Sequence, residues 1–232
     1  MAERKKRMLM VLKTLVLLGL MAASMLFASL EPLSLISLKS TTPGLSFKEH
    51  ESVNFYVCLF FIAFLLPPLQ YFILLIGGSN TNLYNLCLES YLGCTFTFLV
   101  TNIIKWCVGR ERPDYADRIA RTIGQTRLEA KRSFPSGHSS MSFAAAFYLA
   151  YESSLAIKKV RSNGAKAVLI YMGIVVPLGL AGIVAYTRIL DHKHDVIDVT
   201  VGSLLGLFIP YSIRNVIMRE RRIESMKNVV VQ

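Results

Sequence analysis

Residues 52–88 contain no charged residue. One membrane-spanning helix needs about 20 mostly apolar residues, so this stretch is too long for a single span and long enough for two. A run of turn-forming residues at positions 77–82 divides it. We therefore expect a membrane protein with helices over residues 52–76 and 83–104, joined by a short turn.

The composition of the whole chain agrees with this expectation. Charged residues make up 18% of the 232 residues and hydrophobic residues 53%, whereas soluble domains carry roughly 25% charged residues. The formal net charge is +11. A soluble globular domain is excluded by the low content of charged residues, and a disordered basic chain by the large apolar content.

Further apolar stretches complete a predicted all-α fold, a six-span transmembrane helical bundle that forms one domain over residues 1–232. Pro67 and Pro68 predict a kink in the second span. The first span could instead be a cleaved signal peptide, since basic residues precede it and small residues follow it, and five spans would then remain. The six expected spans are residues 8–30, 52–76, 83–104, 139–157, 167–187 and 194–217.

The distribution of basic residues predicts how the bundle is oriented. The N-terminal run of residues 4–7 favours cytoplasmic N- and C-termini, although the two sides carry nearly equal numbers of Lys and Arg. The basic C-terminal tail is expected to attract anionic membrane lipids and not nucleic acid. Glu89 and Glu152, near the inner ends of two spans, are expected to snorkel to the interface.

A first polar cluster follows the third predicted span. Lys105 and Arg112 are seven residues apart, which is two helical turns, so we expect both on one helix face, with Pro113 ending the helix. A plain stop-transfer cluster at the membrane surface is the alternative interpretation.

A second cluster, Ser136-Gly137-His138, precedes the fourth span. Free backbone N–H groups and the helix dipole at such a helix start favour anion binding. The hydroxyl group of Ser136 and the titratable ring of His138 add to this chemistry. The alternative is an ordinary helix cap with an incidental histidine.

A third cluster contains Arg188, His194 and Asp198. His194 and Asp198 are spaced i, i+4 and therefore share a helix face. A carboxylate that holds one ring nitrogen fixes the tautomer and leaves the other nitrogen free to attack. The alternative is an interfacial capping pair. The neighbouring His192 and Asp195 are expected to point elsewhere and to have no role.

With six spans, all three clusters lie at one membrane face. Lys105, Arg112 and Arg188 would hold a multiply charged anion, and the two histidines would supply a nucleophile and an acid. This set favours phosphoryl transfer through a phosphohistidine. Since it offers no carboxylate cage for Mg²⁺ and no spacing of zinc ligands, we expect neither a metal nor a cofactor.

These residues resemble the type-2 phosphatidic acid phosphatase superfamily, in particular its membrane branch, the lipid phosphate phosphatases. That pattern is Lys-x6-Arg-Pro, then Pro-Ser-Gly-His, then Ser-Arg-x5-His-x3-Asp. One position departs from it, since Thr187 stands where the family has Ser, and it keeps the hydroxyl group. The pattern is met here by Lys105, Arg112, Pro113, Pro135, Ser136, Gly137, His138, Arg188, His194 and Asp198.

The resemblance implies a metal-independent phosphatase that acts on lipid phosphate monoesters such as phosphatidate, lysophosphatidate or sphingoid phosphates. It assigns catalysis to His194, His138 and Asp198. A polyisoprenyl-diphosphate phosphatase with the same site, or a catalytically silent lipid-binding scaffold, are the alternatives. The resemblance further assigns phosphate binding to Lys105, Arg112, Ser136, Gly137 and Arg188.

Overall fold

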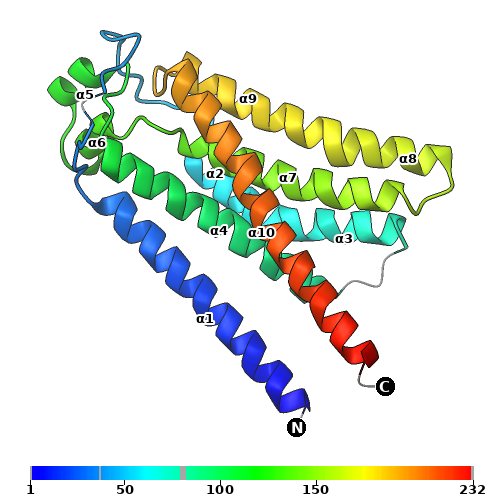
Figure 1. Ribbon diagram of the computed structural model, residues 1–232. Helices are drawn as coiled ribbons and strands as arrows, with labels where there is room; N and C mark the ends of the chain where they lie inside the picture. Colours follow the sequence, from blue (N-terminus) through cyan, green and yellow to red (C-terminus); the bar gives the residue numbers. More distant parts are fainter. Residues whose placement is uncertain (1, 37, 79–81, 231–232) are drawn as a thin grey trace.

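A computed structural model describes residues 2–36, 38–78 and 82–230, and in these ranges the chain forms helices and no strand. The long helices run side by side in one bundle (Figure 1). The elements are α1 (Ala2–Ser29), α2 (Phe55–Phe60), η1 (Phe61–Leu65), α3 (Leu66–Ile76), α4 (Leu83–Val108), α5 (Tyr115–Arg121), α6 (Gly124–Leu128), η2 (Glu129–Lys131), α7 (Gly137–Ile157), α8 (Asn163–Ile170), η3 (Tyr171–Val175), α9 (Val176–Leu190) and α10 (Val196–Val230).

Five helical segments are long and apolar enough to cross a membrane, so the chain is a multi-pass membrane protein. The predicted span at residues 139–157 is helical as α7 but does not belong to these five. Helix α7 instead packs against α3, α4, α9 and α10 in the middle of the bundle (Figure 1). The many Ala and Ser residues of α7 give it a low mean hydropathy. A helix surrounded by other helices does not need the large apolar side chains that face lipid. The five segments are Met10–Ser29, Phe55–Ile76, Leu83–Val108, Asn163–Leu190 and Val196–Ile223.

The predicted proline kink takes the form of a π-helical segment. The segment η1 immediately precedes the turn that contains Pro67 and Pro68, and a second π-helical segment, η3, precedes Pro177 in the same way. A proline removes one backbone donor and clashes with the carbonyl of the preceding turn, and a locally widened turn relieves that clash. Half of the predicted turn at residues 77–82 falls outside the described residues, since 79–81 are not described.

Two glycines allow α10 to lie directly on α7. A Cβ atom on Gly202 would lie 2.5 Å from the carbonyl oxygen of Ser136, and one on Gly206 would overlap the carbonyl oxygen of Ser140. Small residues four apart permit such close backbone approach between membrane helices. The first turn of α10 is therefore held against the first turn of α7, where the predicted site lies.

A buried ion-pair cluster joins the same helices near the opposite end of the bundle. Arg214 of α10 donates to Glu89 of α4 and, at 2.8 Å, to Glu152 of α7. Arg221 also pairs with Glu89, and the Arg214 guanidinium lies over the ring of Tyr151. The snorkelling expectation for the two glutamates was wrong, because both side chains are buried and paired inside the bundle.

The two ends of the bundle differ in character. The short elements α5, α6 and η2 form a cap over one end, where α4 and α9 end and α7 and α10 begin (Figure 1). Helix α1 begins and α10 ends at the other end (Figure 1). The predicted site therefore lies at the end of the bundle remote from both termini.

Candidate active site

A cavity of about 480 Å³ opens beneath the cap, and its wall combines residues from all three predicted clusters. Two further predicted residues, Ser136 and Asp198, are fully buried behind this wall. The structure thus brings the three clusters to one place. The predicted residues in the cavity wall are Lys105, Arg112, Gly137, His138, Arg188 and His194.

His194 and Asp198 are adjacent, as their spacing predicts. The Nδ1 atom of His194 lies 3.7 Å from Oδ2 of Asp198, which is longer than a hydrogen bond. The hydroxyl group of Ser133 lies between them, 2.5 Å from Oδ2 of Asp198 and 3.5 Å from Nδ1 of His194. The Nδ1 side of the ring therefore faces Ser133 and Asp198, which leaves Nε2 for the cavity.

His194 lies just outside the membrane-spanning part of α10, and its surroundings favour the neutral ring. Burial lowers its pKa to about 3; Asp198 opposes this shift, while the positive charges of Arg112 and Lys105 reinforce it. A neutral imidazole has the lone pair that a nucleophile needs. At neutral pH the ring is thus held in its reactive protonation state.

Lys105 and Arg112 reach the same cavity, but not from one helix face. Helix α4 ends at Val108, and Gly109 follows in the left-handed conformation with φ of 62°. Arg112 therefore lies on the chain beyond the helix. The expectation of two turns of a continuous helix was wrong, because a left-handed glycine ends the helix three residues before the arginine.

The two cations have different partners. The Nζ atom of Lys105 donates to the backbone carbonyl groups of Arg132 and Ser133, so no carboxylate neutralises it directly. Arg112 donates to Glu129 at 2.6 Å, and its buried Nε has no hydrogen-bond partner among the described residues. Both side chains therefore keep donor capacity for an anion.

Ser136 is the N-cap of α7 and faces inward. Its hydroxyl oxygen accepts hydrogen bonds from the backbone N–H and the hydroxyl group of Ser139. The next residue, Gly137, lines the cavity, where a Cβ atom would come no closer than 3.9 Å to Lys105 or Phe55. The first turn of α7 thus offers backbone to the cavity, while Ser136 fixes where that turn begins.

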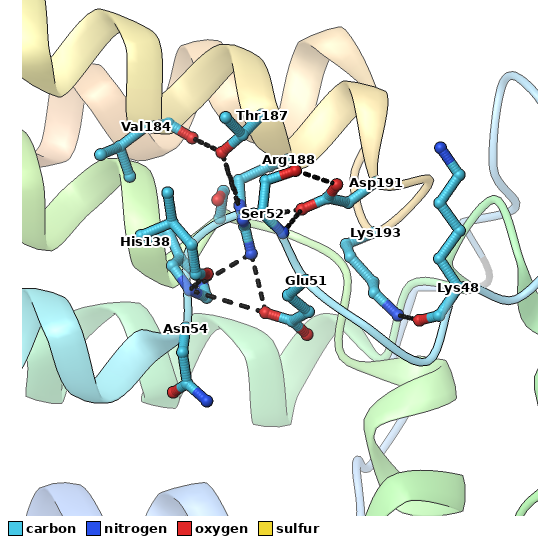
Figure 2. Close-up of polar contacts among 12 residues, drawn as sticks. Lys48, Glu51, Ser52, Asn54, His138, Val184, Thr187, Arg188, Asp191 and Lys193 are labelled. Carbon is cyan, nitrogen blue, oxygen red and sulfur yellow. Dashed lines mark hydrogen bonds and ion pairs between the residues drawn. The ribbon is translucent and has the colours of Figure 1, made fainter.

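Arg188 is held by carboxylates on two sides (Figure 2). It donates to Glu51 at 2.8 Å and to Asp191 at 2.8 Å. The hydroxyl oxygen of Thr187 accepts from the same guanidinium and donates to the Val184 carbonyl group (Figure 2). The hydroxyl group of Thr187 therefore helps to orient Arg188.

His138 lies beside Arg188 (Figure 2). Its Nε2 atom is 3.1 Å from the Val53 carbonyl oxygen, 3.3 Å from Arg188 Nη1 and 3.8 Å from the Glu51 carboxylate. The ring also packs edge-on against Phe55. His138 and His194 thus reach the same cavity, one from α7 and the other from the segment before α10.

Several residues around the cavity were not found from the sequence. Asp195, expected to have no role, accepts from Arg110 and from the loop residues Ser40, Thr41 and Thr42. This contact is structural: the buried carboxylate anchors a loop distant in sequence, and Asp195 is not among the described residues of the cavity wall. Other missed contributors are Glu51, Arg110, Glu129 and Ser133, which lie outside the motif positions.

Comparison with known proteins agrees with this geometry. Residues 86–222, more than half of the chain, match the PAP2 superfamily model. These residues include most of α4 and α10 and all of α7 and α9, and they contain the three clusters. No solved structure matches the chain significantly.

Relatives with curated names point the same way. A PA-phosphatase related-family protein of Dictyostelium discoideum is 34% identical over 152 residues, which cover 65% of this chain and 56% of that protein. Diacylglycerol pyrophosphate phosphatase 1 of Saccharomyces cerevisiae is 32% identical, covering 64% and 58%. Probable lipid phosphate phosphatase 4 of Arabidopsis thaliana is 29% identical, covering 55% and 46%. The chain spans about half the length of these relatives, and by its match over residues 86–222 it belongs to the PAP2 superfamily.

Proposed function

We propose that the chain is a lipid phosphate phosphatase that hydrolyses a phosphate monoester through a phosphohistidine at His194. The observation that carries the proposal is that a neutral, buried His194 shares one cavity with the basic side chains of Lys105, Arg112 and Arg188. Lys105, Arg112, Arg188 and the backbone at Gly137 would hold the phosphoryl oxygens. These groups compensate negative charge where it develops in the transition state.

In the first step, Nε2 of His194 attacks phosphorus and the bond from phosphorus to the lipid oxygen breaks. Burial and the neighbouring Arg188 lower the pKa of His138, so the negative charge of the bound phosphate must favour its protonated form. In that form His138 gives its proton to the leaving oxygen, and the lipid departs as an alcohol. In the second step, His138 takes a proton from water as that water attacks phosphorus. The phosphorus–nitrogen bond breaks, inorganic phosphate leaves, and both histidines return to their starting states.

The cavity wall supports a lipid as the substrate. Apolar side chains from α1, α2 and α4 also line the cavity, among them Met25, Leu59 and Phe98. A charged head and an apolar tail would therefore find matching walls in one cavity. We propose that the head enters at the capped end of the bundle, on the outer or lumenal side, with both termini cytoplasmic.

The proposal is tested by phosphate release from detergent micelles that contain EDTA. Phosphatidate, lysophosphatidate, sphingosine phosphate and farnesyl diphosphate serve as separate substrates. His194→Asn is the test variant. His192→Asn is the matched control, because His192 has a φ of 60° that asparagine tolerates, and its ring forms one hydrogen bond with the described residues, to the Ser46 carbonyl group.

We expect release by the wild type and by His192→Asn, and none by His194→Asn. The ranking of the four substrates then identifies the lipid class. Release that persists in His194→Asn, or a folded wild type that releases phosphate from none of the four, would contradict the proposed function.

A further inference from the structure

Arg110 lies behind the active-site cavity and binds two carboxylates at once. Its Nη1 donates to Oδ1 of Asp198 at 2.8 Å, and its Nη2 donates to Oδ2 of Asp195 at 3.0 Å. Its Nε donates to the Lys39 carbonyl group at 3.2 Å. The side chain is 5% exposed, and it is not part of the cavity wall defined by the described residues.

The two oxygens of Asp198 have separate sets of partners. Arg110 takes Oδ1, whereas Oδ2 accepts from the hydroxyl group of Ser133 and from the backbone N–H of Asp195 and faces His194. A carboxylate held at both oxygens cannot rotate. The ring of His194 can then meet Oδ2 in only one orientation, with Nε2 toward the cavity.

We propose that Arg110 is a positioning residue, which fixes the orientation and the charged state of Asp198 and, through it, the ring of His194. The inference rests on the proposed function, in which His194 attacks phosphorus. It assigns to Arg110 a part in catalysis without contact to the substrate, unlike Lys105 and Arg112. The planar fork of an arginine is suited to this task because it spans two carboxylates, whereas a lysine is a point charge.

The other carboxylate of the fork belongs to a separate anchor. Asp195 is held by the loop residues Ser40, Thr41 and Thr42 as well as by Arg110. Removing the Asp195 charge therefore weakens the contacts of Asp195 with the loop and with Arg110, while the contact from Arg110 to Asp198 remains. Asp195→Asn thus separates a general effect of packing from an effect that passes through Asp198.

The test compares Arg110→Lys with Asp195→Asn in the full-length protein in detergent. Arg110→Lys removes the fork but keeps a positive charge beside the two buried carboxylates. We therefore expect this variant to fold more readily than one with a neutral residue at position 110. Size-exclusion profiles and thermal melts check folding. The kinetic readouts are kcat, KM and the single-turnover rate of phosphoenzyme formation with the best substrate of the panel above.

We expect Arg110→Lys to lower kcat and the rate of phosphoenzyme formation by about 10- to 100-fold, because small misplacements of a reacting group cost this much. KM should change by less than about threefold, because Arg110 does not touch the substrate. Asp195→Asn should lower kcat by less than about threefold.

Three results would overturn the inference: an unchanged kcat in Arg110→Lys, a loss confined to KM, or equal losses in Arg110→Lys and Asp195→Asn. The proposed function fails separately. If the wild type releases no phosphate, or His194→Asn keeps its activity, the phosphohistidine mechanism is wrong, whereas a wild-type rate in Arg110→Lys beside an inactive His194→Asn rejects only the positioning role.

Discussion

The backbone N–H of Ser136 donates a 2.9 Å hydrogen bond to the backbone carbonyl group of Asp198. This bond joins the first turn of α7, which offers Gly137 and His138 to the cavity, to the first turn of α10. Two clusters more than 50 residues apart in the chain are thus fixed to one another by backbone. The site depends on this junction of helices, and its packing can be tested directly.

Gly202→Ala should disrupt that junction. The new Cβ atom would lie 2.5 Å from the Ser136 carbonyl oxygen, and a backbone atom cannot move aside as a side-chain tip can. Overpacking of this kind costs about 1–3 kcal/mol, so we expect a lower melting temperature and a lower kcat. Gly182→Ala on α9 is the control, because nothing lies within 4 Å of its Cβ position. Equal melting temperatures for the two variants would contradict the close packing.

Arg214→Met should destabilise the bundle at its other end. The substitution leaves the buried carboxylates of Glu89 and Glu152 without this cation, and breaking such a buried pair costs about 3–5 kcal/mol. Arg219→Met, on the exposed side of the same helix, is the matched control. Thermal unfolding in detergent measures the difference. An Arg214→Met protein as stable as the control would show that the cluster is not a structural clamp.

Stability should depend on pH through His194. Its pKa is about 3 in the folded protein, because the ring is buried, and about 6.5 in the unfolded chain. Between these values the unfolded chain binds a proton that the folded protein does not, so stability falls as pH drops below 6.5. The slope from this group is at most about 1.4 kcal/mol per pH unit.

His194→Gln removes this titration. Melting temperatures at pH 7 and pH 5 should therefore differ less in the variant than in the wild type. An identical pH dependence of the two proteins would show that His194 is not buried as a neutral ring.

Glu51→Gln should strengthen anion binding. The Glu51 carboxylate pairs with Arg188 and lines the cavity, so it competes with a phosphate for the same guanidinium. Because the Glu51 side chain is 32% exposed, solvent screens this competition, and a gain of about threefold in affinity is expected.

Competitive inhibition by inorganic phosphate measures that affinity. Glu49→Gln, an exposed neighbour in the same loop, is the control and should leave the inhibition constant unchanged. A higher inhibition constant in Glu51→Gln would mean that Glu51 orders Arg188 for the anion and does not compete with the anion.

Much of the fold and the site could be predicted from the sequence. Apolar length located the helices, and the spacing of His194 and Asp198 placed both on one side of the start of α10. Contacts between residues distant in the chain could not be predicted in this way. The partner of Glu152 is Arg214, 62 residues away, and hydropathy alone suggested the membrane interface for both glutamates.

Local backbone conformation was the second feature that could not be predicted from the sequence. The left-handed turn at Gly109 moves Arg112 off the helix, and no periodicity of side chains reveals such a turn. The roles of Arg110 and Ser133 were hidden for a related reason, since both act on Asp198 from segments that lie next to α10 only in the folded chain.

We propose that His194 carries the phosphoryl group during turnover, and a trapped intermediate would reveal this directly. Rapid mixing with a phosphatidate labelled in its phosphate, followed by quenching in base, would trap the intermediate for mass spectrometry of the peptides. We expect a label on His194 that forms before phosphate is released and is absent from His194→Asn. Turnover without any labelled protein, or a label on a different residue, would contradict it.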